Sequence, residues 1–185
     1  MGAAACWAAT TPQTDAVLSK ENLMRIYAVP YTGTITNAGG DTDLFSFAPA
    51  DDKAIRLRGF RLSQISEVGD AAEEGLRIAV RRMTATWTVG SGGSAITALA
   101  PLGESTGTVW GFTARGNDTT ISTTSGTNQV CDEMGWNIRN SPYEWIYPDV
   151  DFCPVAKQGE AIVICQHTTA ADDYTGHFTA WVEEI

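Results

Sequence analysis

The sequence predicts an all-β protein, an antiparallel two-sheet β-sandwich of the jelly-roll kind with about eight or nine strands. From Met24 onward, short runs rich in Val, Ile, Thr, Tyr, Phe and Trp alternate with clusters of Gly, Asn, Asp and Ser. Helical periodicity is nearly absent, whereas several runs alternate apolar and polar side chains. Short strands separated by turn residues are typical of two packed antiparallel sheets.

The chain divides into an N-terminal segment and one expected domain. Residues 24–185 are predicted to form a single β-sandwich domain, whereas residues 1–23 are Ala-rich, then polar, and show no strand pattern. Two interpretations of 1–23 stay open: an N-terminal arm that docks on a neighbour, or a translated leader ahead of a natural start at Met24. Codons for Lys20 and Glu21 can form a ribosome-binding sequence just upstream of the Met24 codon. The candidate strands, in chain order, are 25–31, 43–47, 54–66, 75–89, 106–114, 129–138, 143–147, 161–168 and 176–184.

Two of these strands indicate which face they bury and where they are irregular. Between Leu76 and Val80 the apolar side chains share one side, and Arg77 and Arg81 are expected on the solvent side. The phase of the apolar positions changes after Val80, which predicts a β-bulge near Arg81. A similar change of phase predicts an irregularity at Gly59.

The C-terminal strands carry a different pattern. Residues 161–165 are apolar on both faces, which predicts a central strand. The connection to 176–184 is short, so we expect the two strands to form an antiparallel pair. The polar Gly-, Ser- and Thr-rich segments 90–94 and 116–128 are predicted to be exposed loops.

Composition argues against several classes of partner. The chain has 22 acidic and 12 basic residues and a formal net charge of −10. We therefore expect neither nucleic acid nor an anionic membrane surface as a partner. The four cysteines contain no C-x-x-C pair and are predicted to be small buried thiols, with a disulfide among the last three, or zinc, as alternatives: Cys6, Cys131, Cys153 and Cys165.

No sequence motif points to catalysis. The chain has no G-x-S-x-G nucleophile elbow, and 90–94 lacks the Lys-Ser/Thr ending of a phosphate loop. We therefore predict that the protein is not an enzyme, with no catalytic residue, no cofactor and no metal. His167 and His177 are expected to face each other across a hairpin near Cys165, as a polar pair or, alternatively, as a metal or pH-sensitive contact. The run 39–43 offers carboxylates without the spacing of a calcium loop, so turn chemistry explains it better.

Two groups of residues remain as candidate partner contacts. Ahead of Arg77 lies an acidic run that we interpret as a solvated contact loop, in preference to a catalytic or divalent-ion site: Glu67, Asp70, Glu73 and Glu74. Further on lies an aromatic cluster that could form an interface or a sugar-stacking platform, with about half of it filling the core: Trp136, Tyr143, Trp145, Tyr147 and Phe152.

Several sequence blocks within residues 49–82 resemble those of a known protein family. The blocks Pro49–Lys53, Leu62–Ala71, Glu73–Glu74 and Leu76–Ile78 resemble a recurrent family of uncharacterised proteins encoded by tailed bacteriophages and prophages. Similar members continue with a Gly/Ser-rich turn and a Pro-Leu segment, as in 90–102, and close with a strand ending in Glu-Glu, as in 181–185. The likeness covers most of 24–185. It has no counterpart for 1–23, which favours the leader interpretation, and it departs most in 136–153.

The resemblance implies a virion structural protein, without placing it in the head or the tail. We expect a capsid decoration or cement protein on the capsid surface, made in the host cytoplasm, that binds between subunits of the major capsid protein and self-associates, with a trimer as one arrangement. The alternative is a receptor- or carbohydrate-binding module of a tail or fibre. The expected partner contacts are Glu67, Asp70, Glu73, Glu74, Trp136, Tyr143, Trp145 and Tyr147.

Overall fold

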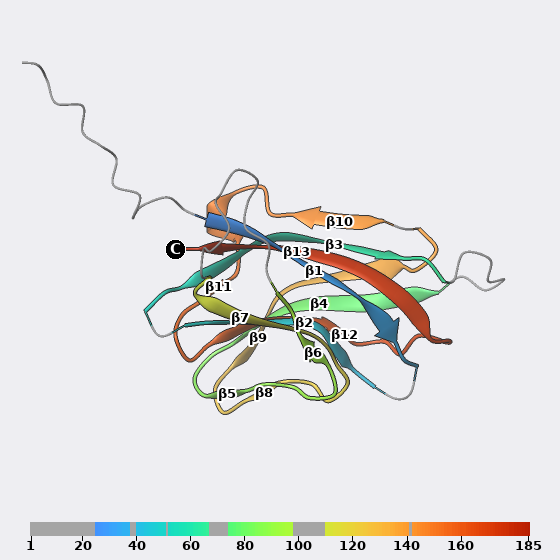
Figure 1. Ribbon diagram of the computed structural model, residues 1–185, viewed down its shortest axis with the longest axis horizontal. Helices are drawn as coiled ribbons and strands as arrows, with labels where there is room; N and C mark the ends of the chain where they lie inside the picture. Colours follow the sequence, from blue (N-terminus) through green and yellow to red (C-terminus); the bar gives the residue numbers. More distant parts are fainter. Residues whose placement is uncertain (1–24, 38–39, 51, 67–73, 98–109, 141) are drawn as a thin grey trace, which may run out of the picture.

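Two antiparallel sheets pack face to face around a common core (Figure 1). The computed structural model describes residues 25–37, 40–50, 52–66, 74–97, 110–140 and 142–185, so the predicted arm or leader at 1–23 lies outside the described residues. Sheet A has the strand order β1 (Arg25–Ile35), β13 (Tyr174–Glu184), β3 (Ile55–Gln64) and β10 (Tyr143–Ile146), with β11 (Val155–Ala156) also pairing with β3. Sheet B has the order β6 (Ser94–Ala95), β7 (Phe112–Asp118), β2 (Thr42–Pro49), β12 (Ala161–Gln166), β4 (Gly75–Met83) and β9 (Asn128–Asn137).

The strand order is that of a jelly roll. Four antiparallel pairs follow one another along the chain and alternate between the sheets: β1 with β13, β2 with β12, β3 with β10, and β4 with β9. This is the pattern of one long double ribbon rolled into a sandwich. The roll separates β12 from β13, which lie in different sheets. The antiparallel pair expected between 161–168 and 176–184 is therefore wrong, because the short connection crosses between sheets.

Aromatic and branched side chains fill the space between the sheets. Phe178 of β13 lies at the centre, with the rings of Phe45, Trp136 and Tyr174 packed edge-on around it at centroid distances of 6.3, 6.3 and 6.5 Å. Such edge-to-face pairs add to the free energy gained by burying apolar area. The core therefore joins strands from both ends of the chain.

Both predicted irregularities are confirmed. The register of β4 against β9 shifts between Val80 and Arg81. On sheet A the register of β13 against β3 shifts beside Gly59. A Cβ at Gly59 would lie 2.5 Å from the carbonyl oxygen of Trp145, so a side chain there would push β10 away from β3.

Two predicted strands have different bounds in the structure. The run 75–89 divides into β4 and the short β5 (Trp87–Thr88), because Ala85 lies between them with φ 60° and turns the chain. The strand predicted at 106–114 is β7 and begins only at Phe112; residues 106–109 lie outside the described residues. Central strand β12 is confirmed, with all six residues buried.

Of the segments predicted as exposed loops, 116–118 belong to β7, and the rest is largely exposed but also covers sheet B. β5 pairs with β8 (Thr123–Thr124), and Ser91 bridges to Thr120. We call residues 84–94 and 119–127 the outer cover; in Figure 1 its strands β5 and β8 lie below sheet B. Trp87 and Ile121 of the outer cover pack against side chains on the outer face of sheet B, namely Met83, Ala161, Val163 and Cys165. The apolar outer side of β12 is therefore buried by a Thr- and Gly-rich segment.

An ion pair is buried beneath the outer cover. Arg81 Nη2 donates to Asp43 Oδ1 at 2.9 Å, with side-chain exposures of 4% and 0%. The backbone N–H of Ser122 donates to the other carboxylate oxygen at 2.6 Å. Burial raises the pKa of Asp43, and the hydrogen bonds from Ser122 and the charge of Arg81 oppose that rise. The predicted solvent position of Arg81 is wrong, because the outer cover removes that face from water; Arg77 is exposed as predicted.

Candidate functional site

β10 and the 3-10 helix η2 (Val150–Phe152), which follow one another along the chain, expose four large apolar side chains. We call this set the edge strip and define it by Trp145, Ile146, Val150 and Phe152, whose exposures are 36%, 59%, 41% and 70%. Figure 1 shows β10 at the outer edge of the sandwich. Four exposed large apolar side chains within eight consecutive residues are unusual for a surface that faces only water.

The backbone explains why these side chains are exposed. Trp145 pairs with Phe60 and Ile146 with Gly59, so the two side chains point to opposite faces of the sheet. Among the described residues β10 is the last strand of sheet A, and no further strand covers its outer side. The Asp149 side chain accepts the N–H of Asp151 at 3.1 Å and caps η2, which precedes β11. Phe152 also lines a shallow pocket next to Val130, which is 52% exposed.

The predicted aromatic contacts divide between core and surface. Trp136 is 1% exposed and packs edge-on against Tyr174, while Tyr147 is 6% exposed. Tyr143 is half-buried and packs against the core. Of the five, Trp136 and Tyr147 are buried, Tyr143 is half-buried, and Trp145 and Phe152 are exposed, so about half of the cluster fills the core, as expected. Ile146 and Val150 were missed; their signal was a set of apolar residues on both sides of Pro148, interrupted by Asp149 and Asp151, that the four-residue strand β10 could not bury.

The acidic run is only partly described. Glu67, Asp70 and Glu73 lie outside the described residues. Glu74 is half-buried and its carboxylate accepts the backbone N–H of Ala171. Glu74 thereby ties the start of β4 to the segment that crosses from β12 to β13.

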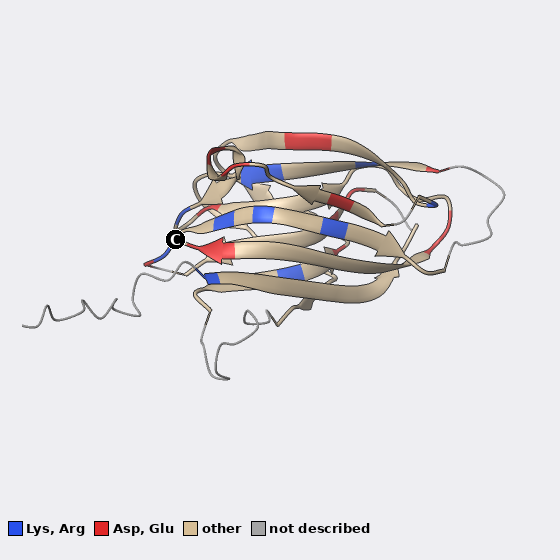
Figure 2. Cartoon of the chain, turned by 90° about the horizontal axis from the view of Figure 1, so that it is seen from above, with Lys and Arg blue, Asp and Glu red and all other residues tan. Residues whose placement is uncertain are grey.

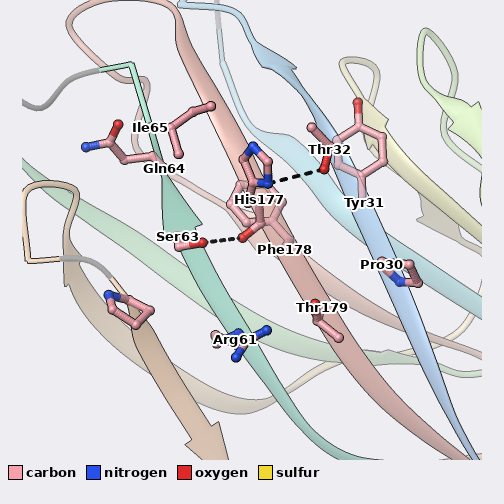
Figure 3. A pocket seen from close by; sticks show the side chains of 11 residues that line it. Pro30, Tyr31, Thr32, Arg61, Ser63, Gln64, Ile65, His177, Phe178 and Thr179 are labelled. Atoms are coloured by element: carbon pink, nitrogen blue, oxygen red, sulfur yellow. Dashed lines mark hydrogen bonds between the residues drawn. The ribbon is translucent and has the colours of Figure 1, made fainter. Parts of the chain in front are cut away.

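A groove of about 460 Å³ lies on the outer face of sheet A (Figure 3). It crosses β1, β13 and β3, and His177 stands in its middle, 3.4 Å from the Thr32 hydroxyl. The Ser63 hydroxyl donates to the His177 carbonyl at 2.7 Å. Hydroxyl groups and an imidazole therefore share one concave surface, whereas the Tyr31 ring stacks on Phe178 on the core side of sheet A.

Arg61 is the cation of this groove. Neighbouring Arg56 and Arg58 both form ion pairs with Glu183, at 3.2 and 3.5 Å. Within the described part of the chain, no salt bridge or side-chain hydrogen bond engages Arg61. Figure 2 shows the basic positions of β3 in a row beside the acidic end of β13. The sequence carried no signal for this groove, because its lining comes from three strands that are distant in the chain.

The two histidines do not face each other. His167 Nδ1 lies 2.7 Å from Asp41 Oδ2 beside sheet B, whereas His177 lies on sheet A. The expected cross-hairpin pair is therefore wrong, for the same reason as the strand pair. Of the three cysteines in the described residues, Cys153 and Cys165 are buried as predicted and Cys131 is exposed; all three are free thiols.

No protein-family model, curated protein or solved structure gives a significant match to this chain. Among the described residues, no helix is both long enough and apolar enough to cross a membrane. Its function must therefore be argued from its own surfaces.

Proposed function

We propose that this protein is a virion structural protein of a tailed bacteriophage, a decoration or cement protein that binds between subunits of the major capsid protein. The edge strip is the observation that carries the proposal. The resemblance of residues 49–82 to a phage family and the jelly-roll architecture, which recurs in capsid proteins, support it. The fold alone would not specify a function.

The edge strip has the chemistry of an interface core. Phe152 at 70% and Ile146 at 59% exposure would leave water on binding, and each such side chain contributes about 1.5–3 kcal/mol when fully buried. Aromatic anchors such as Trp145 are typical of interface hot spots. The net charge of −10 complements basic patches on a partner and would speed association.

The test is binding to phage heads assembled without this protein. Wild-type protein should bind at a copy number that is a simple fraction of the capsid subunits, measured by quantitative mass spectrometry of purified heads. Ile146→Asp and Phe152→Asp should each reduce binding strongly, because a charge would be buried in the interface. The matched control is Ile65→Asp, at a residue 61% exposed but outside the edge strip, which should bind as wild type.

Two results would contradict the proposal. One is the absence of the protein from purified heads in an infection where it is made. The other is equal binding by the Phe152→Asp and Ile65→Asp variants, with both proteins folded by circular dichroism.

The groove on sheet A favours a second candidate, a receptor- or carbohydrate-binding module. Arg61, which has no ion-pair partner among the described residues, and the hydroxyls of Thr32 and Thr179 match the groups that hold an acidic sugar. Under this candidate, a glycan array should show hits among acidic glycans that Arg61→Ala abolishes, while Phe152→Asp keeps them. An array without hits would exclude it.

A further inference from the structure

Four potential metal ligands share the outer face of two neighbouring strands. In the register of β12 against β2, Cys165 lies opposite Asp43. His167 follows Cys165 by two residues and Asp41 precedes Asp43 by two, so the next rung places His167 beside Asp41. Residues two apart on a strand point to the same face. A Cys-x-His pair thus faces an Asp-x-Asp pair across one antiparallel ladder.

Three of these side chains converge. One ligand atom each from Asp41, Cys165 and His167 lies within 4.8 Å of the other two. The His167 to Asp41 distance is 2.7 Å, and their side chains are 18% and 36% exposed, whereas Cys165 is fully buried. The cluster is therefore closed on the Cys165 side and open to water on the Asp41 side.

We propose that Asp41, Cys165 and His167 bind a divalent cation of the zinc class. A thiolate, an imidazole nitrogen and a carboxylate oxygen are the ligands that Zn²⁺ prefers, and three protein ligands leave a fourth tetrahedral position for water on the open side. Calcium and magnesium prefer six or more oxygen ligands and do not suit a thiolate. On binding, the Cys165 Sγ–H loses its proton to solvent and the sulfur lone pair forms the bond to the metal.

The charges around the cluster suit a cation. Asp43 is next to Cys165, but both its oxygens already accept hydrogen bonds, from Arg81 and Ser122, so it contributes to the field and not to the ligand set. Arg77 on the neighbouring strand is held by Glu133. The two arginine charges near the site are therefore each paired with a carboxylate, and the Asp41 charge remains for the metal.

A metal bound at this cluster would link the N-terminal and C-terminal halves of the chain. β2 comes from the N-terminal half of the chain and β12 from the C-terminal half, and they pair at the centre of sheet B. A bound cation would raise the stability of the folded state by mass action, since the unfolded chain does not hold the three ligands together. This effect is independent of whether the edge strip binds a capsid.

The test is a titration of the metal-free protein with Co²⁺, which reports thiolate ligation through a charge-transfer absorption band. We expect a band that saturates at one equivalent, is displaced by Zn²⁺ and is lost in Cys165→Ser. Asp41→Asn and His167→Ala should weaken Co²⁺ binding by at least about tenfold, since even partners outside a ligand set cost that much. Zn²⁺ should also raise the melting temperature of the wild type and not that of His167→Ala.

Matched controls come from the other histidine and an exposed thiol. His177→Ala and Cys131→Ser should bind Co²⁺ as the wild type does. His167→Ala changes a partly exposed residue, so it keeps the test decisive should Cys165→Ser fail to fold. The absence of a charge-transfer band in the wild type, or a band that persists unchanged in His167→Ala, would overturn the proposal.

Discussion

The outer faces of the two sheets differ. On sheet B the outward side chains Ala161 and Val163 are fully buried, because the outer cover packs over them. On sheet A the outward side chains of β13, among them His177 and Thr179, line an open groove. The two faces belong to one sandwich and share one core, yet among the described residues only sheet B has a third layer.

The difference shows how a strand's pattern reports what covers it. A strand that is apolar on both faces, such as β12, needs material on both sides; a strand that alternates, such as β13, needs only a core on one side. The edge strip is the exception on sheet A. Its side chains are as apolar as those under the outer cover, and within the described residues nothing covers them. The partner that we propose would cover them.

The largest effect should come from the ion pair beneath the outer cover. Asp43→Ala leaves the Arg81 charge buried without its partner and should lower the free energy of unfolding by about 3–5 kcal/mol, measured by urea denaturation. Adding Arg81→Met should recover most of the loss, because an apolar pair of similar volume is tolerated there. Glu133→Ala breaks the exposed ion pair with Arg77 and serves as the control. Its urea denaturation midpoint should be close to that of the wild type. An equally small effect for Asp43→Ala would mean that the outer cover does not exclude water.

A second test removes apolar volume under the outer cover. Met83→Ala should cost about 2–4 kcal/mol, since the side chain is fully buried against Trp87 and the outer cover. The control Val130→Ala, at a 52% exposed residue of the neighbouring strand, should stay within about 0.5 kcal/mol of wild type. Similar values for the two variants would show that the outer cover opens freely.

A smaller effect is expected at the end of sheet B, where Arg82 forms two hydrogen bonds of 2.8 Å with Glu160. Burial would raise the pKa of Glu160, but the Lys157 N–H and Arg82 outweigh it and lower the pKa. The stabilisation is therefore present above the unfolded pKa of about 4.3 and is lost as the pH falls through the folded value. Glu160→Gln should cost about 1 kcal/mol at neutral pH, and the difference from wild type should vanish once the pH has fallen below the folded pKa of Glu160. If the difference in unfolding free energy between wild type and variant grew as the pH fell, the pKa of Glu160 would be raised by folding and not lowered.

The smallest effect is expected on the open face. Thr179→Ala removes a groove hydroxyl and should change the free energy of unfolding by less than about 0.5 kcal/mol. A thermal melt of the variant checks this, and a loss comparable to that of Met83→Ala would show that sheet A is covered as well.

Much of the fold could be predicted because its signals are local. Three features can be predicted from neighbouring residues on a single strand. They are the alternation of apolar and polar side chains along β4, the register shift after Val80 and the irregularity at Gly59. The candidate site was harder, since only Trp145 and Phe152 of the predicted aromatic cluster are exposed and the edge strip was only partly identified. Exposure at an edge depends on whether another strand lies beyond it, and no local pattern carries that information.

The sequence by itself determined the class of fold, the strands and the face that most of them bury. The reason is that successive side chains of a strand point to alternate faces, so the buried face can be read from neighbouring residues. Tertiary structure decided the rest. Rolling of the double ribbon placed β12 and β13 in different sheets, set His167 beside Asp41, and laid a Thr- and Gly-rich segment over Arg81. Those outcomes depend on pairing between segments far apart in the chain, where the free energy comes from contacts that no single stretch contains.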